Sequence, residues 1–238
     1  MKSLHIITPV KDSIDSTLES ARAIMSSELS APFTYTIYND FSTPENTKRL
    51  EEAAIEFGFE LVNLSDITDH PSPNYLLVLQ RAQQRAIAAE AGLLIVESDV
   101  IVEKHTLQSL FDGALARANC GIAASVTVDD NGEINYPYLY AKGRKTDVYK
   151  EPKHLSFCCS LLTLKLLNAF NFMTLDPEKN WHDVTISHKS LEVGCENYLF
   201  VNLPVVHRPH GSRPWKQLKY TNPLKYYWLK YTKGLDKI

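Results

Sequence analysis

The sequence predicts an α/β protein with a largely parallel sheet and helices on both faces. Three observations lead to this prediction. Short apolar runs alternate with amphipathic helical segments through the first half of the chain, and this alternation is typical of parallel sheets. The 238 residues are 44% hydrophobic and 22% charged, as in ordinary globular proteins. The length suits a single domain, or one domain with a tail.

The predicted strands are short, apolar runs, as expected for strands that are buried on both faces. They cover residues 4–10, 33–38, 59–64, 92–97 and 120–128. Helices are predicted between them. Those segments are 13–29, 44–57, 72–91 and 103–118. For the second helix, Thr43 is a good N-cap, Pro44 suits the first helical position and Gly58 predicts the end.

The second half of the chain is less regular. Residues 132–141 follow a turn and predict an edge hairpin, and the polar segment 141–154 predicts a loop. Residues 155–170 are strongly apolar and should lie in the core. A helix is predicted from residue 182 to Gly194, and a pair of strands within 197–207.

Charge is divided unevenly along the chain. Residues 213–238 hold seven basic side chains, one acidic side chain and six aromatic rings, a net charge of +6. Because the whole chain carries −3, residues 1–212 carry −9. We therefore treat 1–212 as one domain and 213–238 as a basic, aromatic tail. The near-neutral total argues against a nucleic-acid partner, which would require a basic surface.

Targeting and redox features favour a cytoplasmic protein. The apolar run near the N-terminus is too short for a signal peptide, and no run approaches the length of a spanning helix. The four cysteines contain no C-x-x-C pair, and the adjacent Cys158 and Cys159 are expected to be small core residues.

Acidic clusters stand where predicted strands and helices end or begin. Asn39-Asp40 leaves the second strand, Glu97-Ser98-Asp99 leaves the fourth, and His182-Asp183 starts a helix. Each cluster alone could be a helix cap or a solvated turn. The first two share the carboxyl edge of one sheet, where ligands bind in α/β proteins. Together they indicate a binding site at that edge.

Six segments, in order, resemble motifs of the family-2 glycosyltransferases, which have the GT-A nucleotide-sugar-binding fold. They are HIITPVKDS (5–13), YNDFST (38–43), IVESDVIV (95–102), FCCSLLTLKLLNAFNFM (157–173), WHDVTISHKSLEVG (181–194) and VVHRPHGS (205–212). The resemblance implies a Rossmann-like mixed sheet flanked by helices, with a nucleotide-binding part at about 1–128 and an acceptor part at about 129–212. The chain departs from the family pattern at Asn39, His182, Thr185 and Lys189.

The resemblance also implies a reaction and its residues. It implies an inverting transfer of a hexosyl or N-acetylhexosaminyl group from a nucleotide-diphosphate sugar, usually a UDP-sugar, to a hydroxyl of a glycan or lipid-linked acceptor. Asp183 would be the catalytic base. Asp99 and His207 would bind Mn²⁺ or Mg²⁺, which would stabilise the departing diphosphate. The nucleotide sugar would be contacted by Pro9, Asp40, Glu97, Ser98 and Arg213.

Two other functions compete with this interpretation. A non-catalytic nucleotide-sugar or glycan-binding module would explain the altered motif residues. A sugar-1-phosphate nucleotidyltransferase would have a similar core. Enzymes of that class share a glycine-rich, basic loop directly after the first strand. Here that position reads TPVKDSIDS, without glycine.

The tail carries a separate prediction. From Pro223 onward, Leu224, Tyr227, Trp228 and Tyr231 are spaced three to four residues apart and should share one helix face. Clustered lysines favour anionic lipid, so the tail indicates peripheral contact with the inner face of a cytoplasmic membrane. The alternative is that the tail aromatics pack on the domain.

Overall fold

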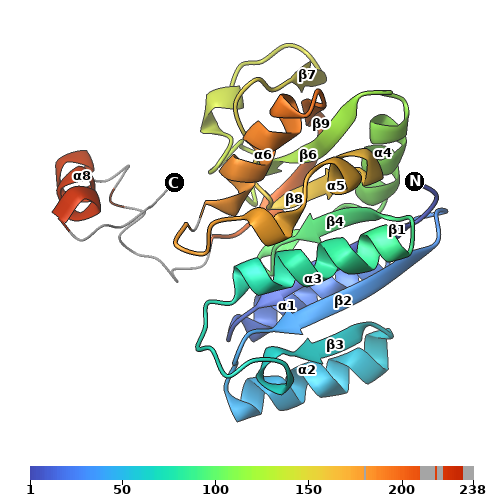
Figure 1. The fold of residues 1–238 in the computed structure, drawn as a ribbon, viewed down its shortest axis with the longest axis vertical. Coiled ribbons are helices and arrows are strands. Elements are labelled where there is room, and N and C mark those ends of the chain that lie inside the picture. The colour runs from blue at the N-terminus through green and yellow to red at the C-terminus, as the bar shows by residue number, and fades with distance from the viewer. Residues whose placement is uncertain (180, 210–217, 219–221, 233–238) are drawn as a thin grey trace.

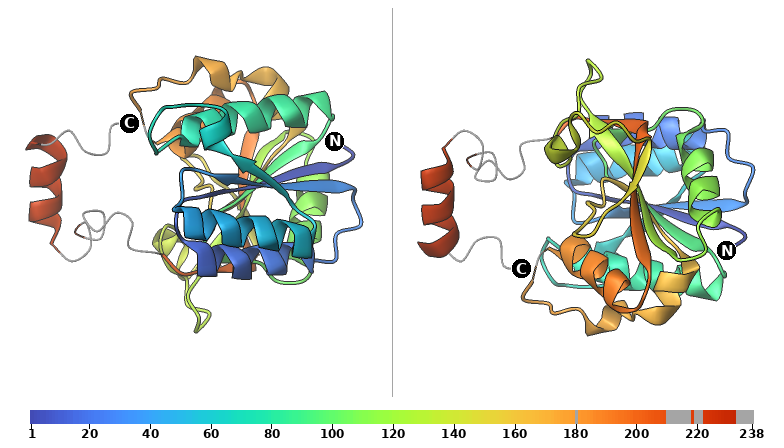
Figure 2. Two further views of the ribbon diagram at one scale, coloured as in Figure 1. Left: turned by 90° about the horizontal axis from the view of Figure 1, so that it is seen from below. Right: turned by 90° about the horizontal axis from the view of Figure 1, so that it is seen from above.

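A computed structural model describes residues 1–179, 181–209, 218 and 222–232. The domain is built on a curled, nine-stranded mixed sheet with helices on both faces (Figures 1 and 2). Its strands are Leu4–Val10 (β1), Phe33–Asn39 (β2), Glu60–Asn63 (β3), Gly92–Val96 (β4), Val100–Ile101 (β5), Cys120–Val128 (β6), Val148–Lys150 (β7), Cys159–Leu162 (β8) and Glu196–His207 (β9). The predicted α/β class is confirmed.

The sheet combines a parallel half with a mixed half. The strand order is β3-β2-β1-β4-β8-β6-β9-β5, and β7 pairs with β9. Strands β3, β2, β1 and β4 are parallel to their neighbours. Strand β8 runs antiparallel between β4 and β6, and β9 then pairs parallel with β6. One late segment of the chain is thereby inserted into the middle of the sheet.

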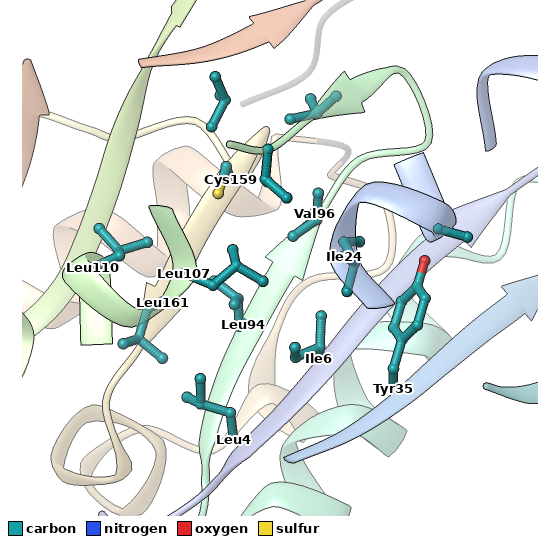
Figure 3. Close-up of a cluster of buried hydrophobic side chains, with 14 of the residues drawn as sticks. Leu4, Ile6, Ile24, Tyr35, Leu94, Val96, Leu107, Leu110, Cys159 and Leu161 are labelled. Carbon is teal, nitrogen blue, oxygen red and sulfur yellow. The ribbon is translucent and has the colours of Figure 1, made fainter. Parts of the chain in front are cut away.

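Helices cover both faces and bury two separate cores. They are Ile14–Met25 (α1), Pro44–Phe57 (α2), Tyr75–Ala88 (α3), Thr106–Leu115 (α4), Leu164–Ala169 (α5) and His182–Glu192 (α6), and a further helix, Pro223–Thr232 (α8), belongs to the tail. Helices α1, α2 and α4 pack on one core, and α3, α5 and α6 on the other. Alternation along β1 directs Leu4 and Ile6 into the first core and Ile7 into the second. Figure 3 shows part of the first core, including Leu94 and Leu161.

The predicted ends of α2 are confirmed. The Thr43 side chain accepts a hydrogen bond from the Asn46 N–H, and Pro44 occupies the first turn. Gly58 ends the helix with φ of 79°, a left-handed conformation that costs glycine little because it has no Cβ. These local signals mark both ends of α2, and Asp12 adds hydrogen bonds from Thr43 and Asn46 at its start.

Several predictions for the second half of the chain are wrong. Residues 132–141 form no hairpin: Ile134 makes a single bridge to Val128, and Leu139–Ala141 form a 3-10 turn. The polar segment 141–154 contains β7, which pairs with β9. Residues 197–207 belong to one strand, not two. The β6–β9 register shifts near Pro204, which lacks an N–H for the ladder, and the strand continues beyond it.

Candidate functional site

The candidate site lies where strand ends meet at one edge of the sheet. Strands β1, β2, β4, β6 and β9 run in the same direction, so their carboxyl ends share that edge. Strand β8 runs the opposite way and begins there. The predicted site residues on these strands therefore come from segments that are far apart in sequence.

The short strand β5 positions Asp99 against His207. Val100 pairs with His207, and the Arg208 N–H donates to the Asp99 carbonyl over 3.0 Å. This register places His207 Nε2 3.7 Å from Asp99 Oδ2, with both side chains about 95% buried. The predicted metal-binding pair is thus brought together by the backbone.

A backbone carbonyl orients the His207 ring. The Nδ1 atom lies 2.7 Å from the Tyr136 carbonyl oxygen. Because a carbonyl can only accept, Nδ1 carries a proton, and Nε2 is the nitrogen that faces Asp99 and the site. Histidines that bind metals commonly have their second nitrogen held in this way. Asp99 and His207 therefore fit the requirements of a divalent cation.

Glu97 lies beside the same pair. It follows β4, and its N–H donates to the Cys158 carbonyl over 2.9 Å, which extends the antiparallel β4–β8 ladder. The Cys158 thiol donates to Glu97 Oε2 over 3.2 Å. Burial of the Glu97 carboxyl, and then the negative charge of Asp99, raise the pKa of Glu97. A neighbouring positive charge, such as a bound cation, would stabilise the ionised form of this carboxyl group.

Asp183 reaches the same neighbourhood from α6. It occupies the first helical turn, and its Oδ1 accepts from the Val184 N–H over 2.9 Å. Its negative charge also contributes to the raised pKa of Glu97, although less than that of Asp99. The electrostatic influence links Asp183 to the cluster on β4, β5 and β9. Asp183 thus acts electrostatically on Glu97, and its role as the base stays a prediction.

Asp40 makes a dense set of hydrogen bonds within the protein. Its Oδ2 accepts from the Ser72 hydroxyl at 2.7 Å and the Asn74 N–H at 2.8 Å, and Oδ1 accepts from the Asn74 side chain at 2.8 Å. The carboxylate thus holds the segment that leads into α3. Each carboxylate oxygen can accept more than one hydrogen bond, so these contacts leave room for a bond from a nucleotide. The role of Asp40 as a nucleotide contact stays a prediction.

These contacts predict a clear effect on stability. Hydrogen bonds to charged groups typically contribute about 1.5–3 kcal/mol each, so we expect Asp40→Ala to lower the free energy of unfolding by about 3 kcal/mol or more. The control is Asp66→Ala, at an exposed position, which should change the free energy of unfolding by less than about 0.5 kcal/mol. Urea unfolding measures both. Equal midpoints for Asp40→Ala and the parent protein would contradict this role.

The remaining predicted residues occupy different positions. Pro9 is half-buried near the carboxyl end of β1, opposite Tyr38, and Ser98 is buried between Glu97 and Asp99. Arg213 lies outside the described residues. None of the nucleotide contacts is tested by this arrangement, and all of them stay predictions.

Two departures from the family motifs have structural explanations. The Asn39 side chain donates to Thr47 and Asn63 and accepts from the Ser42 N–H, so it holds the turn after β2. His182 is buried with its ring centroid 6.3 Å from that of Tyr75, and burial lowers its pKa. His182 is therefore mostly neutral near pH 7, unlike the glutamate usual at this position.

Sequence reasoning missed two residues of the site. Cys158 is a buried core residue, as predicted, but its contact with Glu97 was not foreseen, and Tyr136 was assigned to a hairpin. Both reach the site through their backbone positions opposite Glu97 and His207. No local pattern marks either residue, because their roles depend on which distant strands become neighbours.

No protein-family model and no curated protein sequence matches the chain. Solved structures do. One is a fragment of S. aureus TarS in complex with UDP-GlcNAc, with a TM-score of 0.63 and 16% identity over 89% of this chain and 61% of that one. Another is the mannosyltransferase PcManGT from Pyrobaculum calidifontis in complex with GDP-Man and Mn²⁺, with a TM-score of 0.62 and 13% identity over 94% of this chain and 63% of that one.

These similarities show the fold class. The chain has the GT-A-like fold of glycosyltransferase structures, as the sequence motifs led us to expect. It spans about three-fifths of the length of these two chains, and 38% of a longer S. aureus TarS chain.

Proposed function

We propose that the protein is a metal-dependent, inverting glycosyltransferase. Its donor would be a nucleotide-diphosphate sugar, with UDP as the nucleotide, and its acceptor a hydroxyl of a glycan or a lipid-linked molecule. The observation that carries the proposal is the Asp99–His207 pair, with Glu97 beside it, at the carboxyl edge of a GT-A-like sheet. UDP-GlcNAc and GDP-Man in two structures of this fold support a nucleotide-sugar donor.

Each group would have a defined task. Asp99 and His207 would hold Mn²⁺ or Mg²⁺, which supplies Lewis-acid stabilisation of the departing diphosphate. Asp183 would accept the proton of the acceptor hydroxyl, an effect typically of about 10²–10⁴ in rate. Attack opposite the leaving group would invert the anomeric centre. Pro9, Asp40, Glu97, Ser98 and Arg213 would contact the nucleotide sugar.

Nucleotide-dependent stabilisation tests this function. We expect UDP with Mn²⁺ to stabilise the protein by about 2.7 kcal/mol at a hundredfold excess over its dissociation constant, because the ligand binds only the folded state. Thermal melts with UDP, GDP and the corresponding sugars, each with and without Mn²⁺, provide the measurement. Unchanged melting temperatures with every nucleotide would overturn the proposal.

Turnover distinguishes an enzyme from a binding module. Asn39 and His182 are the altered motif positions that favour the module. We expect slow, Mn²⁺-dependent release of nucleotide diphosphate from the donor even without acceptor, because water can replace the acceptor hydroxyl. Stabilisation by a nucleotide sugar without any such release would support the non-catalytic module instead.

We also propose that residues 213–238 attach the protein peripherally to an anionic cytoplasmic membrane surface. Within the described residues, no helix is long and apolar enough to cross a bilayer. In α8, the predicted face is exposed: Leu224 by 85%, Tyr227 by 48%, Trp228 by 61% and Tyr231 by 79%. The exposure of this face supports a surface contact, and Trp215 and Tyr220 lie outside the described residues.

Liposome co-sedimentation tests the attachment. We expect the protein to pellet with anionic vesicles at low salt, because each lysine near the surface contributes about 1 kcal/mol. Salt or deletion of 213–238 should reduce pelleting strongly. The double variant Trp228→Ser, Tyr231→Ser keeps every lysine and should bind at an intermediate level. Equal pelleting with neutral and anionic vesicles, or none with either, would refute this role.

A further inference from the structure

A cysteine thiol lies among the acidic and imidazole groups of the candidate site. Cys158 is 2% exposed, and its Sγ lies 3.2 Å from Glu97 Oε2 and 3.3 Å from Ser156 Oγ. One ligand atom from each of Glu97, Cys158 and His207 lies within 4.8 Å of the others. The three donors are therefore a carboxylate oxygen, a sulfur and an imidazole nitrogen.

This donor set suits a small tetrahedral cation. Zinc binds thiolate sulfur, imidazole nitrogen and carboxylate oxygen at about 2.0–2.3 Å, which places neighbouring ligand atoms roughly 3.4–3.8 Å apart. Separations within 4.8 Å reach that geometry through small rotations of the side chains. Asp99 Oδ2 lies 3.7 Å from His207 Nε2, but the group of mutually close donors consists of Glu97, Cys158 and His207, so water or a substrate oxygen would complete the coordination.

The backbone holds these donors in place before any ion binds. The Glu97 N–H to Cys158 carbonyl bond joins two strand ends, and His207 is anchored by its pairing with Val100. The Tyr136 carbonyl sets the direction of the imidazole. Donors on strand ends, oriented by neighbouring groups, are the arrangement expected of a specific metal site.

We propose that Glu97, Cys158 and His207 bind a thiophilic divalent cation of the zinc class, with Glu97 serving as a metal ligand in place of the nucleotide-sugar contact given above, and that Cys158 makes the metal centre prefer such ions to Mg²⁺. A thiolate is a soft ligand that suits zinc, whereas Mg²⁺ prefers oxygen. The thiol proton passes to solvent as the sulfur–metal bond forms. The consequence for donor use rests on the proposed function, but binding of the ion itself does not.

Cobalt spectroscopy of the full chain tests the sulfur ligand directly. Co²⁺ added to chelator-treated protein should produce a sulfur-to-cobalt charge-transfer absorption, which needs a thiolate ligand. We expect this absorption in the parent protein and its loss in Cys158→Ser, whose hydroxyl can keep the hydrogen bonds to Glu97 and Ser156. Cys159→Ser is the matched control, since Cys159 is an equally buried thiol of the same hydrophobic cluster (Figure 3), whereas the three-donor group is formed with Cys158. Cys195→Ser, another buried thiol, is a second control.

Competition titrations give the ion preference. Cys158→Ser should weaken Zn²⁺ binding by at least about tenfold, because removing groups around a metal site typically lowers affinity by that much. The same variant should leave Mn²⁺ binding nearly unchanged. Absence of the absorption in the parent protein, or equal losses for both ions, would overturn the proposal. Circular dichroism confirms that each variant is folded. A sulfur-dependent Co²⁺ spectrum without any nucleotide binding would uphold this metal site while the proposed transferase function failed.

Discussion

Replacing Asp183 with asparagine should reduce glycosyl transfer by about 10²–10⁴, the usual contribution of a general base. The amide keeps the shape of the carboxylate but cannot accept a proton at neutral pH. Asp183 lies in the first turn of α6, where its Oδ1 accepts from the Val184 N–H, and an asparagine oxygen can make the same bond. Initial rates of transfer, measured with saturating donor, provide the test.

Nucleotide binding and a control on the same helix complete this experiment. Asp183→Asn should bind nucleotide diphosphate nearly as well as the parent protein, because the proposed base contacts the acceptor. Glu192→Gln changes an exposed carboxylate at the other end of α6 and should keep full activity. If Asp183→Asn retains transfer within a few-fold of the parent rate, Asp183 is not the base.

Replacing Asp99 with alanine should weaken nucleotide binding by at least about tenfold when Mn²⁺ is present and have little effect in its absence. The proposed cation loses an anionic oxygen ligand, and even losses around a metal site typically cost about 10–100-fold in affinity. His207, 3.7 Å from Asp99, would remain as a weaker site. Calorimetric titration with and without Mn²⁺ measures the difference.

Asp40→Ala is the informative comparison for Asp99→Ala. Because Asp40 is a proposed nucleotide contact, Asp40→Ala should weaken nucleotide binding to the same extent with and without metal. Since we also expect this variant to be less stable, binding should be measured at a temperature where circular dichroism shows it folded. If nucleotide binding depends on Mn²⁺ in the same way in both variants, the separate roles assigned to Asp99 and Asp40 are wrong.

The first half of the fold was predictable because its signals are local. Apolar runs identify β1, β2 and β4, and cap residues such as Thr43 and Gly58 set the ends of α2. Parallel strands joined by helices place their carboxyl ends at one edge, so the shared location of Asp40 and Asp99 follows from chain order alone. The ordered motifs then predicted the GT-A-like fold, which the solved structures confirm.

The second half was less predictable because its strands pair over long distances. The hairpin predicted at 132–141 is absent, and the strand pair predicted at 197–207 is one strand. Strand β8 enters between β4 and β6, although its sequence, an apolar run that resembles a family strand, does not say which strands lie beside it. An apolar run does not encode its neighbours, since pairing depends on the packing of the whole sheet.

The sequence by itself determined the class of fold, the strands after which Asp40 and Glu97 stand, and the helix that carries Asp183. Only the tertiary structure decided that the Cys158 thiol lies against Glu97, 61 residues earlier in the chain, and that the Tyr136 carbonyl orients His207. Helical periods, caps and strand ends are local properties of a chain. The contacts of Cys158 and His207 depend instead on the β4–β8 and β5–β9 registers, which form when distant segments pack together.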